Sequence, residues 1–278
     1  MKKIHLLSLG LCIFFTGLVS AQPKNDLEKM GIKGNVKEQT KLVYEIREKF
    51  GKPDKTLYEK EVTKFNKDGN ITESVIYNSK NRMKSKYVHS YDDKVKKEID
   101  MYNAKGALIY KSVFRYNDKG DLIEESGYHS DGSVKNKVLV EYNAAGQKTK
   151  EKWYNSNGSL IWTKVFQYDE KGNLTEDITY TKDDKFFSKN NYVYDGKGNK
   201  VKWIYSTDSP VGFMIVYKRN KKENHVEALQ YNAEEVLTGK LIYKYNDKGN
   251  LSEEEEYDYV DKFGKKKYEP VKVTEYKY

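Results

Sequence analysis

Charged residues recur at one position of a repeating sequence, in the shorter segments, eight residues after the tyrosine or phenylalanine that precedes each of them. Because strand side chains alternate between the two faces of a sheet, this even spacing predicts that the charges share a face with the aromatic rings. A dry core does not tolerate unpaired charges, so the pattern indicates a wet surface lined by rings, carboxylates and ammonium groups. The charged residues are Glu73, Glu124, Lys150, Glu176, Lys202 and Glu253.

Such a surface suits carbohydrate, because sugar rings stack their C–H faces on aromatic side chains while their hydroxyls bond to charged groups. The alternative is structural: the tyrosines pack together, and the charges pair with Lys152 or with tyrosine hydroxyls, or reach out at the rim. The sequence leaves both open. The candidate ligand-binding residues are Tyr116, Glu124, Tyr142, Trp162, Tyr168, Glu176 and Trp203.

A second candidate surface surrounds Trp153. It precedes Tyr154 by one residue and is therefore expected on the opposite, largely polar face. Counting across the turn pairs Trp153 with Ile161, and Leu139 and Val165 are expected nearby. An apolar cluster on a charged sheet predicts a patch that binds a partner protein, and the alternative is a single exposed tryptophan.

Catalysis finds little support in the sequence. His89, His129 and His225 occupy different phases of the repeat, so the period does not stack them into a shared site. No nucleophile elbow, phosphate loop or calcium-loop motif occurs. The only cysteine is Cys12, near the N-terminus, so thiolate chemistry is not expected in the repeats. We therefore predict no enzyme, no catalytic residues, no metal site and no cofactor.

The elements that would position these residues are short strands. Tyrosine-led turns such as Tyr116–Leu122 and Tyr168–Leu174 recur, with alternating steps of about 12 and 14 residues, so the repeat is about 26 residues long. The segments between turns are rich in Val, Ile, Thr, Tyr and Phe, the residues that are enriched in β-strands. The pattern predicts an all-β fold: a long antiparallel meander of about sixteen strands, coiled into a spiral, an open shell or a wide barrel.

The turn residues predict how each hairpin closes. In Asn117-Asp-Lys-Gly120, the asparagine can bond backbone two residues on, and the glycine can adopt the left-handed conformation. This predicts a three-residue loop with a glycine bulge, closed by Asn117 and Asp121. Tyr116 then lies across from Leu122. Since the steps of 12 and 14 are even, all the tyrosines are expected on one face.

These turns resemble the YD (RHS-type) repeats of exported bacterial proteins. The resemblance covers about 65–257, with the best copies at Tyr116, Tyr168, Tyr194 and Tyr245. It implies extended, coiled β-sheets, some of which form shells around toxins and some of which are surface proteins proposed to bind carbohydrate. The chain departs from the toxin type, because no separate effector follows the last repeat. A weaker resemblance is to MORN-type hairpin repeats, through the short glycine turns.

The N-terminus predicts export. Lys2 and Lys3 precede an apolar stretch, and Val19-Ser-Ala21 matches a signal-peptidase site, which predicts a signal peptide over 1–21. One β-repeat domain is expected over 22–278, with cap and entry strands at 30–64, repeats at 65–257 and a closing strand at 258–278. We expect no integral membrane segment after cleavage, and a location in the periplasm, on the outer surface or outside the cell.

The charge bears on partners. The net charge of +9 becomes +7 when Lys2 and Lys3 leave with the signal, and lysine and glutamate are interspersed rather than blocked. Without a concentrated basic stripe, nucleic acid is not expected as a partner. Two function classes stay open: a non-catalytic protein that binds a cell-envelope or extracellular glycan, and a protein–protein scaffold or assembly subunit of the envelope. A curled sheet with a groove open to solvent would favour the first, and a closed barrel with buried tyrosines and an exposed Trp153 patch would favour the second.

Overall fold

The structure, a computed structural model, describes residues 24–278 except 50–51, 94, 209–211 and 263–264. These residues form one sheet of eighteen antiparallel strands and one short helix, which confirms the all-β prediction. The predicted signal peptide, 1–21, lies outside the described residues. In the described part of the chain, no helix is long and apolar enough to cross a bilayer.

The helix and strands follow one another without any crossover. They are α1 (Asp26–Lys29), β1 (Glu38–Lys49), β2 (Lys52–Phe65), β3 (Ile71–Asn78), β4 (Met83–Asp92), β5 (Val95–Asn103), β6 (Leu108–Tyr116), β7 (Leu122–His129), β8 (Val134–Tyr142), β9 (Lys148–Asn155), β10 (Leu160–Tyr168), β11 (Leu174–Thr181), β12 (Phe186–Tyr194), β13 (Lys200–Thr207), β14 (Gly212–Arg219), β15 (His225–Asn232), β16 (Leu237–Tyr245), β17 (Leu251–Lys262) and β18 (Lys265–Lys277).

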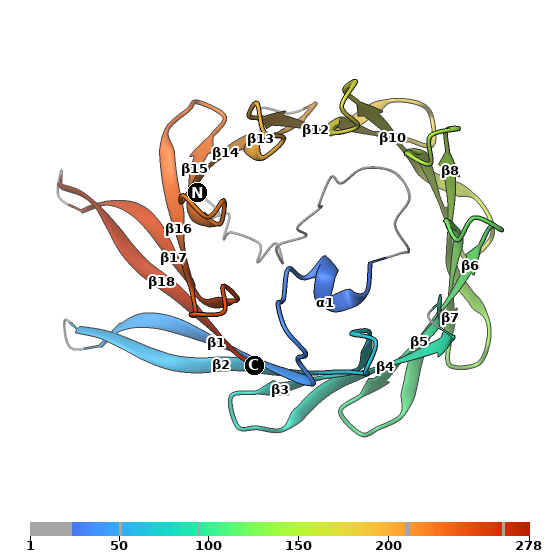
Figure 1. Cartoon of the computed structure of the whole chain (residues 1–278), viewed down its shortest axis with the longest axis horizontal. Helices are drawn as coiled ribbons and strands as arrows, with labels where there is room; N and C mark the ends of the chain where they lie inside the picture. The colour runs from blue at the N-terminus through green and yellow to red at the C-terminus, as the bar shows by residue number, and fades with distance from the viewer. Residues whose placement is uncertain (1–23, 50–51, 94, 209–211, 263–264) are drawn as a thin grey trace.

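The sheet closes on itself. Each strand pairs with its neighbours in sequence, and β18 pairs with β1 from Thr40↔Lys277 to Glu45↔Lys272 (Figure 1). Of the three coiled shapes that the repeat allows, the protein is therefore the wide barrel. The segment predicted as a closing strand, 258–278, holds the end of β17 and the whole of β18, and β18 is paired on both sides.

The hairpin loops follow the predicted turn chemistry. The Asn117 N–H donates to the Asp121 carbonyl at 2.9 Å, and the Gly120 N–H donates to the Asn117 carbonyl at 2.9 Å. The Asn117 side chain accepts from the N–H groups of Lys119 and Asp121. Gly120 has a φ of 83°, the left-handed conformation that glycine adopts at little cost. The three-residue loop and the pairing of Tyr116 with Leu122 are both confirmed.

The prediction that all anchor tyrosines share one face is wrong. After Tyr116 pairs with Leu122, the register shifts, so that Arg115 pairs with Glu124 and Ile123 is an extra residue in β7. One extra residue reverses the alternation of side chains. The next tyrosine, Tyr128, pairs with Lys111 and faces away from Tyr116. Most hairpins carry the same shift, so the tyrosines that end the long strands and those that end the short strands lie on opposite faces.

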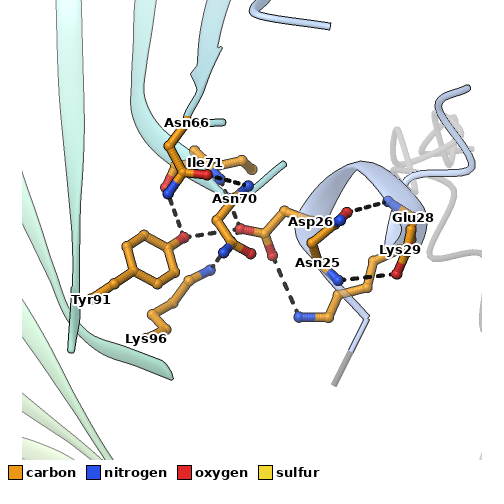
Figure 2. A network of polar contacts seen from close by, with 9 residues as sticks. All are labelled: Asn25, Asp26, Glu28, Lys29, Asn66, Asn70, Ile71, Tyr91 and Lys96. Carbon is orange, nitrogen blue, oxygen red and sulfur yellow. Dashed lines mark hydrogen bonds and ion pairs between the residues drawn. The ribbon is translucent and has the colours of Figure 1, made fainter. Parts of the chain in front are cut away.

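The N-terminal strap, which we define as residues 24–37, identifies the inner face. Figure 1 shows α1 enclosed by the ring of strands. The hydroxyl of Tyr91, the next-to-last residue of β4, reaches the Asp26 carboxylate in α1, so the tyrosines near the ends of the long strands face the lumen (Figure 2). Of the tyrosines near the strand ends, Tyr91, Tyr116, Tyr142, Tyr168, Tyr194 and Tyr245 face inward, and Tyr77, Tyr102, Tyr128, Tyr154, Tyr180 and Tyr231 face outward.

The apolar core lies in two separate places on the lumen side. One cluster joins Leu27 and Ile32 of the strap to Phe65, and the other joins Ile215, Ala228 and Tyr243. A barrel of sixteen to eighteen strands is too wide for side chains to fill. In agreement, large apolar side chains on the inner wall, such as Trp162, stay exposed to solvent. The lumen therefore contains two small apolar clusters and stretches of inner wall that are exposed to solvent.

Candidate functional site

The inner tyrosines at one end of the barrel bind the barrel's own backbone. The hydroxyl of Tyr142 donates to the Leu122 carbonyl at 2.9 Å, and that of Tyr168 to the Lys148 carbonyl at 2.9 Å. Each bond ties a hairpin to the preceding one, twenty residues back in the chain. Burial raises the pKa of Tyr142 to about 12, so the hydroxyl keeps its proton. These predicted ligand-binding tyrosines are therefore part of the scaffold at this end.

The N-terminal strap crosses the same end of the lumen. Asp26 is only 7% exposed, and its carboxylate accepts from the Ile71 N–H at 3.0 Å and the Tyr91 hydroxyl at 3.0 Å (Figure 2). The Lys96 ammonium lies 3.4 Å away. Burial alone would raise the pKa of Asp26, but Lys96 and the hydrogen bonds outweigh it and hold the pKa below its ordinary value. The carboxylate is therefore charged and fixed.

The other end of the strap is held by the β16–β17 turn. The Lys33 N–H donates to Asn250 Oδ1 at 2.7 Å, and Asn250 Nδ2 donates back to the Lys33 carbonyl at 3.0 Å. Asn250 is 1% exposed. The strap thus joins the β2–β3 turn to the β16–β17 turn, across the strands at which the barrel closes.

An aromatic cluster lies on the inner wall toward the opposite end, near the turns that follow β9 and precede β12. Trp153 and Trp162 are cross-strand partners with ring centroids 6.2 Å apart, and Phe187 stacks on Trp162 at 6.4 Å with an interplanar angle of 21°. Trp162 is 38% exposed and Phe187 49% exposed. We call these three residues the aromatic platform. They offer rings on the lumen side that the protein does not cover.

Polar groups occupy the wall next to the platform. Asp177 accepts from the Tyr192 hydroxyl at 2.8 Å and from Asn190 Nδ2 at 2.9 Å, and Lys164 lies 3.3 Å from it. Asn190 Oδ1 also accepts from the indole N–H of Trp203 at 2.8 Å. Since Lys164 is two residues from Trp162 on one strand, charged and amide groups adjoin the aromatic surface on the same face.

The structure separates the predicted ligand-binding residues. Tyr116, Tyr142, Tyr168, Trp162 and Trp203 face the lumen, whereas Glu124 and Glu176 face outward. The expectation that the two carboxylates share a face with the inner tyrosines is wrong, because each follows a bulge. Glu124 pairs with Lys137 outside, at 3.3 Å, and Glu176 with Lys189.

The predicted partner patch is also divided. Trp153 does lie on the face opposite Tyr154, but that face is the lumen and its partner is Trp162, because Ile161 is the extra residue of a bulge. Leu139 pairs with Lys152 and Val165 with Lys150, both on the outer wall. The four residues therefore do not form one surface.

The outer wall is organised by ion pairs. Lysines and carboxylates alternate across neighbouring strands, at exposures where each pair contributes about 0–1 kcal/mol. Examples are Lys64–Glu73, Lys111–Glu98, Lys152–Glu141, Lys218–Glu227 and Lys244–Glu253. A shallow groove of 310 Å³ between β6 and β7, next to Tyr128, carries no comparable cluster of exposed rings.

The three described histidines face the lumen from different strands, β4, β7 and β15. Within the described ranges, no three His, Cys, Asp or Glu side chains gather as they would around a metal ion. Burial lowers the pKa of both His89 and His225 to about 4, so both are neutral near pH 7.

These two histidines predict a pH dependence of stability. An unfolded histidine titrates near pH 6.5, so between pH 6.5 and 4 the unfolded chain binds protons that the folded barrel does not. We expect the free energy of unfolding to fall as pH drops through this window. Urea unfolding at pH 7.5, 5.5 and 4.5 measures it. The double variant His89→Gln, His225→Gln should show a flatter profile, and an unchanged profile would contradict the assignment.

Sequence reasoning missed Phe187, Asp26 and Arg219. Phe187 was hidden because it is the extra residue of a bulge between Phe186 and Ser188. Arg219 could have been found: Asn220 begins a turn like that of Asn117, so Arg219 stands where the other long strands end in an aromatic residue. Asp26 precedes the repeat and has no periodic signal.

No known protein-family model and no curated protein sequence matches the chain. Several solved structures show similarity to the chain at low sequence identity. A porin-like protein from Bacteroides uniformis has 11% identity and a TM-score of 0.46, over 86% of this chain and 96% of that one. TcdB2-TccC3 without its hypervariable C-terminal region has 11% identity and a TM-score of 0.29, over 82% and 16%. A DUF1329 family protein from Desulfovibrio piger has 12% identity and a TM-score of 0.27, over 87% and 84%. None of them assigns a family, so the resemblance to YD repeats stays a prediction.

Proposed function

We propose that the protein is a non-catalytic binding protein that takes a glycan into its lumen, where sugar rings stack on the aromatic platform. The observation that carries this proposal is the exposure of Trp162 and Phe187 on the inner wall. Exposed apolar patches of this kind mark binding sites more often than they serve stability. The polar groups around Asp177 and Lys164 supply hydrogen bonds at the edge of the rings.

The remaining structure agrees with a binding role outside the cytoplasm. The predicted signal peptide implies export to a compartment that contains envelope or extracellular glycans. The outer wall of ion pairs suits contact with water. Since the strap occupies one end of the lumen, we expect the glycan to enter at the end that carries the platform.

The test is binding to a glycan array, followed by titration of the tightest-binding oligosaccharide against variants. Trp162→Ala should weaken binding about tenfold or more, since one stacked aromatic contributes about 1–3 kcal/mol. Phe187→Ala should also weaken it. The matched control is Phe186→Ala, because Phe186 is the adjacent residue, pairs with Tyr180 and faces outward.

Salt separates the two sources of affinity. Binding by stacking should persist at 0.5 M salt, whereas attraction by the net positive charge alone should disappear. If no glycan binds even at low salt, the proposal is wrong. If binding is unaffected by Trp162→Ala and Phe187→Ala, the glycan does not stack on the aromatic platform and the stacking proposal is wrong.

A further inference from the structure

One hairpin of the ring departs from the repeat. At seven of the eight turns on the strap end, an aromatic residue at or next to the end of the long strand faces the lumen, from Phe65 to Tyr245. In the β14–β15 hairpin the residue at this position is Arg219. The turn keeps the hydrogen bonds and pairing of the repeat: the Asn220 N–H donates to the Asn224 carbonyl at 2.9 Å, and Arg219 pairs with His225 as Tyr245 pairs with Leu251. Glu223, with a φ of 61°, also stands where Gly120 stands in its own turn, so this hairpin differs from the repeat at two positions.

Arg219 is held in a fixed position. Its Nη1 donates to the Glu223 carbonyl at 2.5 Å, and its Nη2 lies 2.7 Å from Nε2 of His225. A guanidinium has no acceptor, so Nε2 must present its lone pair and the imidazole proton must lie on Nδ1. The low pKa of His225 agrees with this neutral form. Among the remaining N–H groups of the pair are Arg219 Nε and His225 Nδ1.

Both of these N–H groups are buried and lack a hydrogen-bond partner among the residues that the structure describes. Buried donors without a partner are rare in folded proteins, and each one calls for an acceptor. The nearby carboxylates are engaged elsewhere: Asp195 accepts from the N–H groups of Lys197 and Asn199, and Glu223 binds Lys197 at 2.6 Å and Asn199 Nδ2 at 3.1 Å.

The surroundings favour a negative ligand. The Nζ of Lys200, on β13, lies 5.1 Å from the ring centroid of Tyr192 and 5.8 Å from that of Tyr217. The ring centroids of Tyr217 and His225 are 4.9 Å apart. Two cations and a neutral imidazole donor thus line one stretch of the lumen wall. A planar guanidinium matches the two oxygens of a carboxylate better than any other anion-binding side chain.

We propose that Arg219 and His225 form an anion subsite of the lumen that takes a carboxylate of an acidic glycan. This inference rests on the proposed function and specifies its ligand as a uronic-acid polymer. The platform, on β9, β10 and β12, and the subsite, on β14 and β15, lie toward opposite ends of the barrel, roughly 20 Å apart along the strand direction at ~3.3 Å per residue. The glycan is therefore a chain of several sugar units that contacts both places.

The test uses a hexamer of galacturonic acid and its fully methyl-esterified counterpart, titrated against the intact protein at constant salt. The wild type should bind the acid at least tenfold more tightly than the ester. Arg219→Tyr restores the aromatic residue of the repeat, so it should fold, keep the affinity for the ester and lose the preference for the acid. Arg219→Lys keeps the positive charge but lacks the parallel N–H donors of the guanidinium, so it should show only part of the wild-type preference for the acid. Trp162→Ala should weaken both ligands equally.

A second measurement does not depend on stacking. Addition of galacturonic acid monosaccharide should shift the ¹⁵N resonance of His225 Nδ1 in the wild type and leave it unchanged in Arg219→Tyr. Retention of the acid preference by Arg219→Tyr, or no shift at His225, would overturn the subsite. If His225 responds while Trp162→Ala leaves hexamer binding unchanged, the subsite stands and the stacking proposal fails.

Discussion

Replacement of Asp26 by alanine should release the N-terminal strap. The Asp26 carboxylate is buried against Lys96, Tyr91 and the Ile71 N–H, so its removal leaves a partly buried ammonium without its counter-ion (Figure 2). Breaking one side of a buried pair costs about 3–5 kcal/mol. The Leu27 N–H, which donates to the Gly69 carbonyl at 2.9 Å, should then exchange with solvent roughly 100-fold faster or more, as measured by hydrogen exchange.

Two controls define this expectation. Lys29→Ala removes only an exposed pair with Asp26 at 3.5 Å and should change the exchange of Leu27 little. Combining Asp26→Ala with Lys96→Met removes the stranded charge and should recover part of the loss. An unchanged exchange rate in Asp26→Ala would show that the apolar contacts of Leu27 and Ile32 hold the strap by themselves.

Gly69→Ala should lower the free energy of unfolding by about 2–3 kcal/mol. Two separate effects contribute to this loss. Gly69 has a φ of 80°, and a side chain there costs about 1–2 kcal/mol. A Cβ would also lie 2.9 Å from the Asn25 side chain, which caps α1 by accepting from the Glu28 N–H. Loss of a helix cap costs about 0.5–2 kcal/mol. Urea unfolding of the variant measures the total.

Gly120→Ala is the matched control for this variant. Gly120 occupies the same place in its own hairpin, with a φ of 83°, but a Cβ there meets nothing within 4 Å. Its cost should come from the backbone conformation alone. The difference between the two variants isolates the contact between the β2–β3 turn and the strap, and equal costs would mean that this contact contributes nothing.

The sequence was sufficient for the local architecture because turn chemistry acts over a few residues. Asn117 and Gly120 fix a loop by hydrogen bonds within five residues, and the same residue types recur at each turn, so the meander followed directly. Closure into a barrel required the pairing of β1 with β18, which joins residues more than two hundred positions apart and has no local signal.

The faces could not be predicted because the bulges leave no reliable trace in the sequence. Ile123 and Ile161 look like ordinary strand residues, yet each is the extra residue that reverses the alternation after it. The error placed Glu124 inside and Trp153 outside, and thereby divided both candidate sites wrongly. The aromatic platform depends on the same effect, since Phe187 reaches Trp162 only from a bulge position.

The way the strap is anchored makes the circumference of the barrel adjustable. Its two anchors, at the β2–β3 turn and at Asn250, are separated by β17, β18, β1 and β2, whereas the other strands lie outside this span. Each 26-residue unit adds two strands, or roughly 10 Å of wall at ~4.8 Å per strand, and restores both faces to their starting phase. A gene that gained or lost whole units between 71 and 245 would encode a wider or narrower ring with its seam intact. The diameter of such a barrel would change in steps of one repeat unit, while the strap would keep its length and its contacts.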